Sequence, residues 1–117
     1  NEGQVWEAAL FAAKYKLSNL CAIIDINKIQ IDGKTNEIMN TEPLGKKYNS
    51  FNWRVKRING HSHKSIYSAL KDFVNYKGEK PTVILADTIA GKGLYSIQGK
   101  VAAHGAPINK SHVKEIN

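Results

Sequence analysis

The chain has 117 residues, which is enough for one domain with a single hydrophobic core. A content of 42% hydrophobic and 23% charged residues is typical of a globular protein and excludes a disordered chain. The formal net charge is +7, and the single cysteine, Cys21, excludes a disulfide framework and a cysteine-rich zinc site.

Basic residues outnumber acidic ones by 17 to 10, and all but Arg54 and Arg57 are Lys. Such a surface suits nucleic acid, an acidic surface or phosphorylated metabolites. The Lys residues are scattered and are not interleaved with aromatic residues, so the pattern favours a solvated surface over a nucleic-acid interface. No apolar run reaches the roughly 18–20 residues of a membrane span, and no signal peptide is visible. These features predict a soluble, cytoplasmic protein without a membrane partner.

The first predicted helix covers residues 3–17 and carries apolar residues on two faces, which predicts burial on more than one side. One face has Val5, Ala8, Ala9 and Ala12, and the other has Trp6, Leu10, Ala13 and Leu17. A continuous apolar run over residues 20–26 follows and is typical of a central strand in a parallel sheet.

Regular periodicity is lost over residues 27–40, where Asp32 and Gly33 indicate a turn. Thr41 then predicts the N-cap of a second helix with Pro43 in its first turn.

A second strand is predicted over residues 53–58, and Ser62 is expected to cap an amphipathic helix that stops near Gly78. Residues 81–86 are apolar throughout and predict a third strand. The segment from residue 87 to 109 contains four glycines and is interpreted as a functional loop. Ser111 is expected to cap a short final helix.

Strands separated by helices predict an α/β fold, with a parallel sheet and helices on both faces. In such sheets ligands bind beyond the carboxyl ends of the strands. The positions to inspect are therefore those after Ile26, Ile58 and Ala86.

The strongest local signal follows the first strand, in the run DINKIQIDG (residues 25–33). The amide oxygen of Asn27 and the backbone carbonyl of Ile29 are two hard oxygen donors within one tight loop, as Mg²⁺ prefers. The alternative is an Asn that only turns the chain, and spacing alone favours that alternative.

Two signals occur in the later loop. The run TIAGKG (residues 88–93) permits close approach of backbone to a ligand, but it lacks the Lys-Ser/Thr ending of a phosphate-binding P-loop. His104, in HGAP (residues 104–107), suits a phosphate contact or acid–base chemistry near neutral pH. An exposed loop histidine without a role explains it equally well, and His61 and His63 are interpreted as surface or capping residues.

Taken together, these segments resemble the transketolase family of thiamine-diphosphate enzymes over nearly the whole chain, and most closely the N-terminal subunit of a split transketolase. The matching runs are EGQVWEAA (2–9), DINKIQIDG (25–33), MNTEPL (39–44), NGH (59–61), GKG (91–93) and HGAP (104–107), together with Trp53. Their order and spacing are more specific than any one of them.

The resemblance implies roles for five residues of this sequence. Asn27 would bind Mg²⁺ (or Ca²⁺) and the cofactor diphosphate, and Ile29 would give its carbonyl to the same metal. Ile31 would pack near thiamine diphosphate, and His104 would lie near the diphosphate and the reacting carbon. Glu2 matches a family carboxylate at the subunit interface. The implied reaction is transfer of a two-carbon ketol unit between sugar phosphates.

The family's Gly-Asp-Gly motif, whose Asp is a metal ligand, would fall just before residue 1. We therefore expect residues 1–117 to be the C-terminal portion of the thiamine-diphosphate domain, truncated at its N-terminus. The implied partners are a pyrimidine-binding domain or a C-terminal subunit, and the implied assembly is a homodimer or a heterotetramer. The resemblance also implies a role in pentose phosphate metabolism. The fragment alone is expected to be inactive and to bind the cofactor weakly or not at all.

Several alternatives stay open. One is another thiamine-diphosphate enzyme, such as a deoxyxylulose-phosphate synthase or a 2-oxo-acid dehydrogenase component, although the run at 104–107 favours transketolase. A second is a non-catalytic, basic α/β module that binds nucleic acid with steep salt dependence. A third is a degenerate relative kept for assembly, against which the presence of Asn27 and His104 argues.

Overall fold

The computed structural model describes residues 2–105 and 107–116, which divide into two compact units. The first unit contains residues 2–25 and 41–87, and the second contains residues 26–40 and 88–116. Each unit is described by itself. Within the described ranges, no helix has both the length and the apolar character needed to cross a membrane.

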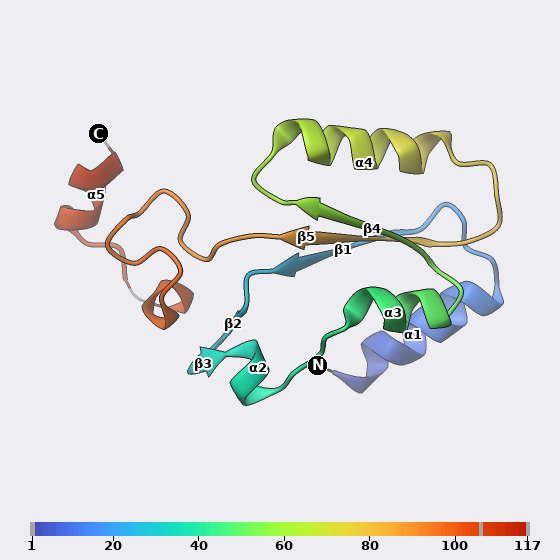
Figure 1. Cartoon of the computed structure of the whole chain (residues 1–117), viewed down its shortest axis with the longest axis horizontal. Helices are drawn as coiled ribbons and strands as arrows, with labels where there is room; N and C mark the ends of the chain where they lie inside the picture. The colour runs from blue at the N-terminus through green and yellow to red at the C-terminus, as the bar shows by residue number, and fades with distance from the viewer. Residues whose placement is uncertain (1, 106, 117) are drawn as a thin grey trace. The chain divides into compact units, whose positions relative to one another are not determined.

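Three parallel strands form the main sheet, in the order β1–β5–β4 (Figure 1). They are β1 (Cys21–Ile26), β4 (Arg54–Asn59) and β5 (Thr82–Asp87). The predicted strands are thus confirmed within one residue at each end. Central β5 carries the most deeply buried side chains, Val83, Ile84 and Leu85, at 1% exposure or less. The sequence of β5 is apolar throughout because a central parallel strand is covered on both faces.

Helices cover both faces of this sheet, as predicted. Helix α4 (His63–Asn75) lies on one face, and α1 (Gly3–Lys14) and α3 (Leu44–Ser50) lie on the other (Figure 1). The indole N–H of Trp53 donates a hydrogen bond to the backbone oxygen of Ala9 at 2.8 Å. The ring of Trp6 also packs against Tyr48, with the centroids 5.7 Å apart. These contacts attach α1 to α3 and to the start of β4.

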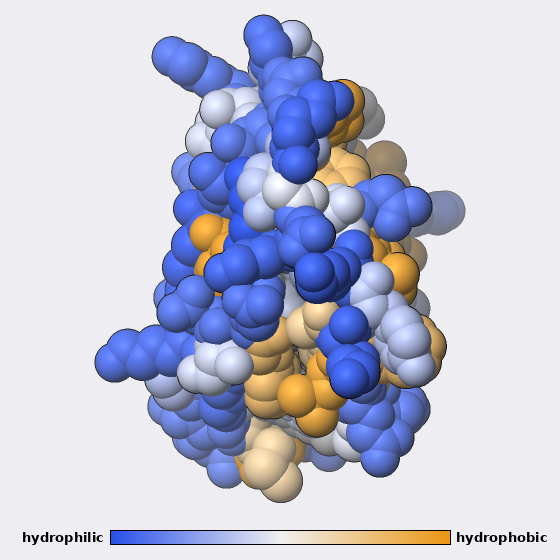
Figure 2. Space-filling view, turned by 90° about the vertical axis from the view of Figure 1, so that its right-hand side faces the viewer, coloured by the Kyte–Doolittle hydropathy of each residue, from blue (hydrophilic) through white to orange (hydrophobic). Residues whose placement is uncertain are grey.

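The prediction that α1 is buried on two faces holds only in part for the described residues. Ala9 and Ala12 are buried, whereas Leu10, Phe11 and Tyr15 are more than half exposed. Trp6 of the second face packs against Tyr48 of α3, but Leu10 of that face stays exposed, so the described elements cover this face only in part. Figure 2 shows apolar surface gathered in the lower half of its view, where α1 and α3 lie.

The helix starts follow the predictions only in part. Ser62 caps α4, and its hydroxyl accepts the N–H of Ser65 at 3.3 Å. Thr41 does not cap α3, because Pro43 directly precedes the helix and the Glu42 carboxylate accepts the N–H of Leu44 at 2.7 Å.

The final helix also has a different cap from the one predicted. The side-chain oxygen of Asn109 accepts the N–H groups of Ser111 and His112, at 3.0 and 3.1 Å. Helix α5 (Lys110–Ile116) therefore begins one residue before Ser111.

The second unit is built from short elements. They are a two-stranded antiparallel ribbon of β2 (Ile29–Gln30) and β3 (Gly33–Lys34), the one-turn helix α2 (Thr35–Ile38), the 3₁₀ helix η1 (Val101–His104), and α5. The sequence predicted a turn at Asp32 and Gly33 but not the ribbon around it, because strands of two residues show no periodicity.

Candidate functional site

The candidate site begins where β1 ends. Asn27 follows the last residue of β1, and its side-chain oxygen accepts the backbone N–H of Ile29 at 2.9 Å. This side-chain turn redirects the chain from the sheet into β2. Lys28, between the two, has a φ of +65° and so lies in the left-handed region, which is uncommon for a residue with a side chain.

The ribbon fixes the direction in which the carbonyl of Ile29 points. Ile29 lies opposite Lys34 and Gln30 lies opposite Gly33, while Thr35 donates its N–H to the oxygen of Lys28 at 3.0 Å. Hydrogen-bonded and non-hydrogen-bonded pairs alternate along an antiparallel ladder. The N–H and C=O of Ile29 are therefore turned away from β3, consistent with the bond of its N–H to Asn27. Asn27 and Ile29 thus present two oxygen atoms from one turn.

Ile31 stands at the tip of this ribbon. Its φ is +49° and its exposed fraction is 63%. A β-branched residue in the left-handed region is strained by about 1–2 kcal/mol, and an exposed isoleucine gains little burial in return. Such strain is found most often where a function fixes the conformation.

His104 is brought to the same unit as Asn27 and Ile29. It is the last residue of η1, which packs against β2, and its side chain is exposed. Of the run at 104–107, Ala106 lies outside the described residues. The structure therefore places η1, whose last residue follows Ile29 by 75 positions along the chain, beside the β2 turn.

The segment predicted as a functional loop, residues 87–109, contains η1, and its glycine-rich part before η1 is folded back on itself. The N–H of Gly99 donates to the oxygen of Ala90 at 2.8 Å, which closes the loop on itself. Gly91 has a φ of +67°, and a Cβ built there would lie 3.0 Å from the Cβ of Ala103 in η1. Close packing of the loop against η1 therefore requires glycine at this position.

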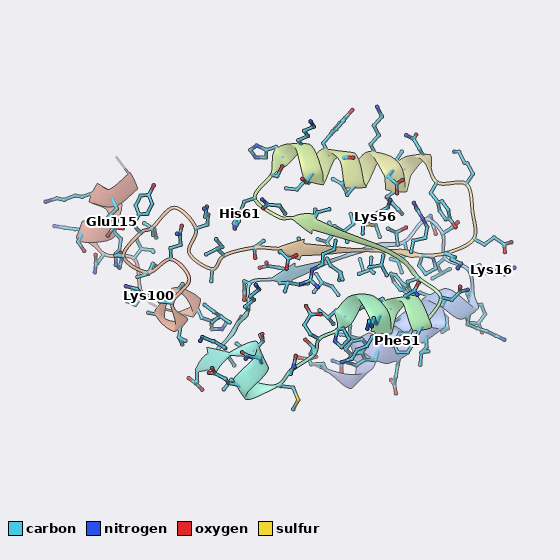
Figure 3. All side chains as sticks on the ribbon, viewed as in Figure 1. Lys16, Phe51, Lys56, His61, Lys100 and Glu115 are labelled. Carbon is cyan, nitrogen blue, oxygen red and sulfur yellow. The ribbon has the colours of Figure 1, made fainter. Side chains whose placement is uncertain are left out.

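An exposed hydrogen bond joins α5 to the same loop. The carboxylate of Glu115 accepts the backbone N–H of Ser96 at 3.0 Å. Hydrogen bonding from Ser96 lowers the pKa of Glu115 below its ordinary value. Glu115 and Lys100 are labelled in this part of Figure 3. No sequence pattern indicated this contact, because it joins two segments that each lack periodicity.

The carboxyl ends of β4 and β5 hold an ion-pair network. Arg57 donates to Asp87 at 2.8 Å and to Glu42 at 3.0 Å. Hydrogen bonds from Arg57 to both carboxylates raise the pKa of the guanidinium. The network ties the segment before α3 to the strand ends, so these two carboxylates are already engaged by a cation. His61 and His63, near the same end, are both exposed, as predicted for surface residues.

Glu2 lies in the first unit, directly before α1, and is exposed. Its carboxylate accepts a hydrogen bond from the side chain of Gln4. Among the described residues, no group of three or more His, Cys, Asp or Glu side chains is arranged to hold a metal ion. A divalent cation would therefore need ligands besides the Asn27 and Ile29 oxygens.

Cys21 is not a candidate nucleophile. It is partly buried at the start of β1, and burial raises the pKa of its thiol. A raised pKa leaves less of the reactive thiolate near neutral pH.

Comparison with known proteins identifies the class. The sequence matches the family described as "Transketolase, thiamine diphosphate binding domain" along residues 1–117. The chain therefore belongs to the transketolase family of thiamine-diphosphate-binding domains. This confirms the family expected from the sequence.

Individual relatives agree with this class. The 6-deoxy-6-sulfo-D-fructose transketolase subunit SqwG of Clostridium sp. is 44% identical over 110 residues, which are 94% of this chain and 40% of that protein. An apulose-4-phosphate transketolase subunit of Phocaeicola vulgatus is 34% identical over 116 residues, 98% of this chain and 41% of that protein. The chain thus spans about two fifths of these curated relatives.

Solved structures confirm the fold. The transketolase of Campylobacter jejuni superposes with a TM-score of 0.90 at 32% identity, covering 98% of this chain and 18% of that one. The described α/β fold, with its parallel sheet and flanking helices, is therefore a part of the transketolase cofactor-binding fold.

Proposed function

We propose that residues 1–117 form the C-terminal portion of a thiamine-diphosphate domain in a transketolase. The complete enzyme would transfer a two-carbon ketol unit between sugar phosphates. The observation that carries the proposal is the turn after β1, where the oxygens of Asn27 and Ile29 are presented from one short segment beside η1. Family membership and the transketolase subunits found among the relatives support it.

The donor set fits a hard divalent cation in part. A carboxamide oxygen has two lone pairs, so Asn27 can accept the Ile29 N–H and still bind a metal. Amide and carbonyl oxygens are ligands that Mg²⁺ and Ca²⁺ accept, with the remaining positions filled by phosphate oxygens, water or a carboxylate. In the proposed enzyme, Asn27 and Ile29 would hold the cation against the cofactor diphosphate.

The other residues act around this anchor. Ile31 offers an exposed apolar side chain, held out at the tip of the ribbon, that suits contact with an aromatic ring. His104 supplies a group that stabilises negative charge or moves a proton near neutral pH. The chemistry that thiamine diphosphate supplies when bound is an electron sink for the carbanion produced by C–C cleavage. Glu2 is proposed to face another subunit.

The complete enzyme would need partners. A pyrimidine-binding domain or C-terminal subunit would complete the site, in a dimer or heterotetramer. The excess of Lys is compatible with anionic sugar-phosphate substrates. The cytoplasm, with its pentose phosphates, is the proposed location.

The test is Asn27→Ala in the complete enzyme that carries this sequence, measured as cofactor affinity by calorimetry and as ketol transfer to an aldose phosphate. We expect a loss of at least 100-fold in either quantity. Asn49→Ala, at an exposed position of α3, is the matched control and should leave both unchanged. Wild-type affinity and activity in Asn27→Ala would refute the proposal.

A second measurement tests the fragment itself. Because the proposed metal ligands among the described residues are only the Asn27 and Ile29 oxygens, calorimetry of the isolated 117 residues with Mg²⁺ and thiamine diphosphate should show no micromolar binding. Micromolar affinity would contradict the view that these residues are only a portion of the cofactor domain.

A further inference from the structure

Strand β4 is an edge of the sheet that the described residues form. It pairs with β5 on one side, and the N–H groups of Arg54 and Gly60 donate to Pro81, just before β5, and to Asp87 at its end. Because the direction of backbone groups alternates along a strand, the N–H and C=O of Val55 and Arg57 point to the opposite side. These are the groups that an added strand would bond.

A groove runs along this edge, between β4 and α4. One part, of about 480 Å³, is lined by four consecutive β4 residues (56–59) and by residues of α4. A second part, of about 530 Å³, continues past Arg54 to Tyr76 and Lys77. Both parts include Ser68 and Asp72, so they adjoin along α4. A groove between an edge strand and a helix is the geometry in which extended peptides are recognised by strand addition.

Cations outnumber carboxylates in this groove, where Asp72 is the one acidic residue among the lining residues. Asp72 on α4 accepts hydrogen bonds or ion pairs from both Arg54 and Lys56, the latter at 3.3 Å. These two cations are therefore drawn towards α4. Figure 3 labels Lys56 between β4 and α4.

Three further cations line the groove and keep their charge uncompensated. Lys64, Lys71 and Lys77 have no carboxylate within salt-bridge distance in the described ranges. The ammonium group of Lys71 lies 5.8 Å from the ring centre of Tyr67, which is itself 66% exposed. The α4 wall is thus positive, with an aromatic side chain beside it.

From the open edge, the adjoining groove and its positive wall, we infer that β4 and α4 form a docking site for an extended, acidic peptide segment of a partner protein. The segment would lie beside β4 as a fourth strand, bonded to the backbone of Val55 and Arg57. Its carboxylates would face Lys64, Lys71 and Lys77. A second copy of this chain does not fit, since its net charge is also positive.

The first experiment uses the complete protein that carries this sequence, labelled with ¹⁵N, and a nine-residue peptide of alternating Glu and Val. Binding should shift the amide signals of Val55 and Arg57 and slow their hydrogen exchange. The control peptide has the same sequence and charge but carries N-methyl groups on alternate residues, which blocks strand addition. We expect its affinity to fall at least tenfold. No binding of the acidic peptide at millimolar concentration would overturn the inference, as would equal binding of the two peptides.

Variants test separately the backbone pairing with β4 and the attraction between charges. Val55→Pro removes an outward N–H without removing a bond to β5, and edge strands tolerate proline. It should weaken binding of the acidic peptide at least fivefold, while the far-ultraviolet circular dichroism spectrum stays unchanged. If it unfolds the chain, the N-methylated peptide on the wild-type chain decides the same point.

The double charge reversal Lys64→Glu with Lys71→Glu should abolish binding, whereas the exposed pair Lys14→Glu with Lys46→Glu is the matched control and should change it less than threefold. An equal loss in both pairs would show non-specific attraction and overturn the site. Equally tight, salt-dependent binding of a single-stranded oligonucleotide to wild type and Val55→Pro would overturn it in favour of general polyanion binding.

Discussion

Replacement of Gly91 by alanine tests the packing that holds the glycine-rich loop against η1. Two costs are expected. The left-handed φ of +67° penalises a side chain by about 1–2 kcal/mol. In addition, the new Cβ would lie 3.0 Å from the Cβ of Ala103, and forced overpacking of this kind costs about 1–3 kcal/mol.

Gly99 provides the matched control for strain alone. Its φ of +71° is nearly the same, but a Cβ there would lie 3.7 Å from a methyl group of Ile89, which is an ordinary contact. Alanine also reduces the entropy of the unfolded chain, which offsets about 0.4–1 kcal/mol of the strain in both variants. The expected net costs are therefore about 1 kcal/mol for Gly99→Ala and about 2–3 kcal/mol for Gly91→Ala.

The assay is native-state hydrogen exchange at the amide of Ala103, which donates to the oxygen of Lys100 at 3.0 Å and reports on η1. A difference of about 1.4 kcal/mol in opening free energy is a tenfold difference in exchange rate. The double variant Gly91→Ala with Ala103→Gly removes the clash, and it should recover the part of the opening free energy that was lost to overpacking. Equal exchange in Gly91→Ala and Gly99→Ala, or no recovery in the double variant, would refute the reasoning.

Three further outcomes are expected. Trp53→Phe should lower the free energy of unfolding in urea by about 1–2 kcal/mol, because the buried hydrogen bond from the indole to Ala9 is lost. Trp6 remains as the fluorescent reporter of unfolding. An unchanged urea midpoint would contradict the role of this hydrogen bond. For Asp72, burial opposes ionisation, but the hydrogen bonds from Arg54 and Lys56 outweigh it and lower the pKa. A lowered folded pKa means stability that is present above the unfolded pKa of about 3.9 and is lost as the pH falls through the lower folded value. Asp72→Asn should therefore destabilise the chain at pH 7 and match the wild-type stability at about pH 2, as measured by thermal scans at both pH values. The same difference between variant and wild type at both pH values would refute a stabilising role of the ionised Asp72 carboxylate. Ile31→Gly should change the free energy of unfolding by less than about 1 kcal/mol, since relief of backbone strain offsets the entropy cost of glycine. It should nevertheless weaken cofactor binding in the complete enzyme. A large loss of stability would show that Ile31 is a structural residue.

Much of the fold was predictable because its causes are local. The continuous apolar runs and the intervening amphipathic helices predicted a parallel sheet covered on both faces, and these elements are confirmed within a few residues. Ser62 was identified as a cap because the Ser side chain satisfies a backbone N–H three residues away. Thr41 and Ser111 were wrong as caps, since neighbouring Glu42 and Asn109 bind the helix N–H groups instead.

The sequence names the residues of the candidate site, but it does not give their arrangement. Asn27, Ile29 and His104 were singled out by residue type, by position after a strand, and by resemblance to a family. The direction of the Ile29 carbonyl depends on a ribbon of two-residue strands, which leaves no periodic pattern in the sequence.

By itself, the sequence determined the family and the class of fold and named candidate segments for the chemistry, because apolar runs, turn residues and motif spacing are properties of short stretches of chain. Only the tertiary structure decided three things: that the glycine-rich loop packs against η1 through Gly91, that η1 lies beside β2, and that β4 offers an open edge with a positive groove. Each depends on contacts between residues far apart in the sequence, and backbone direction and close packing fix such contacts only once the whole chain has folded.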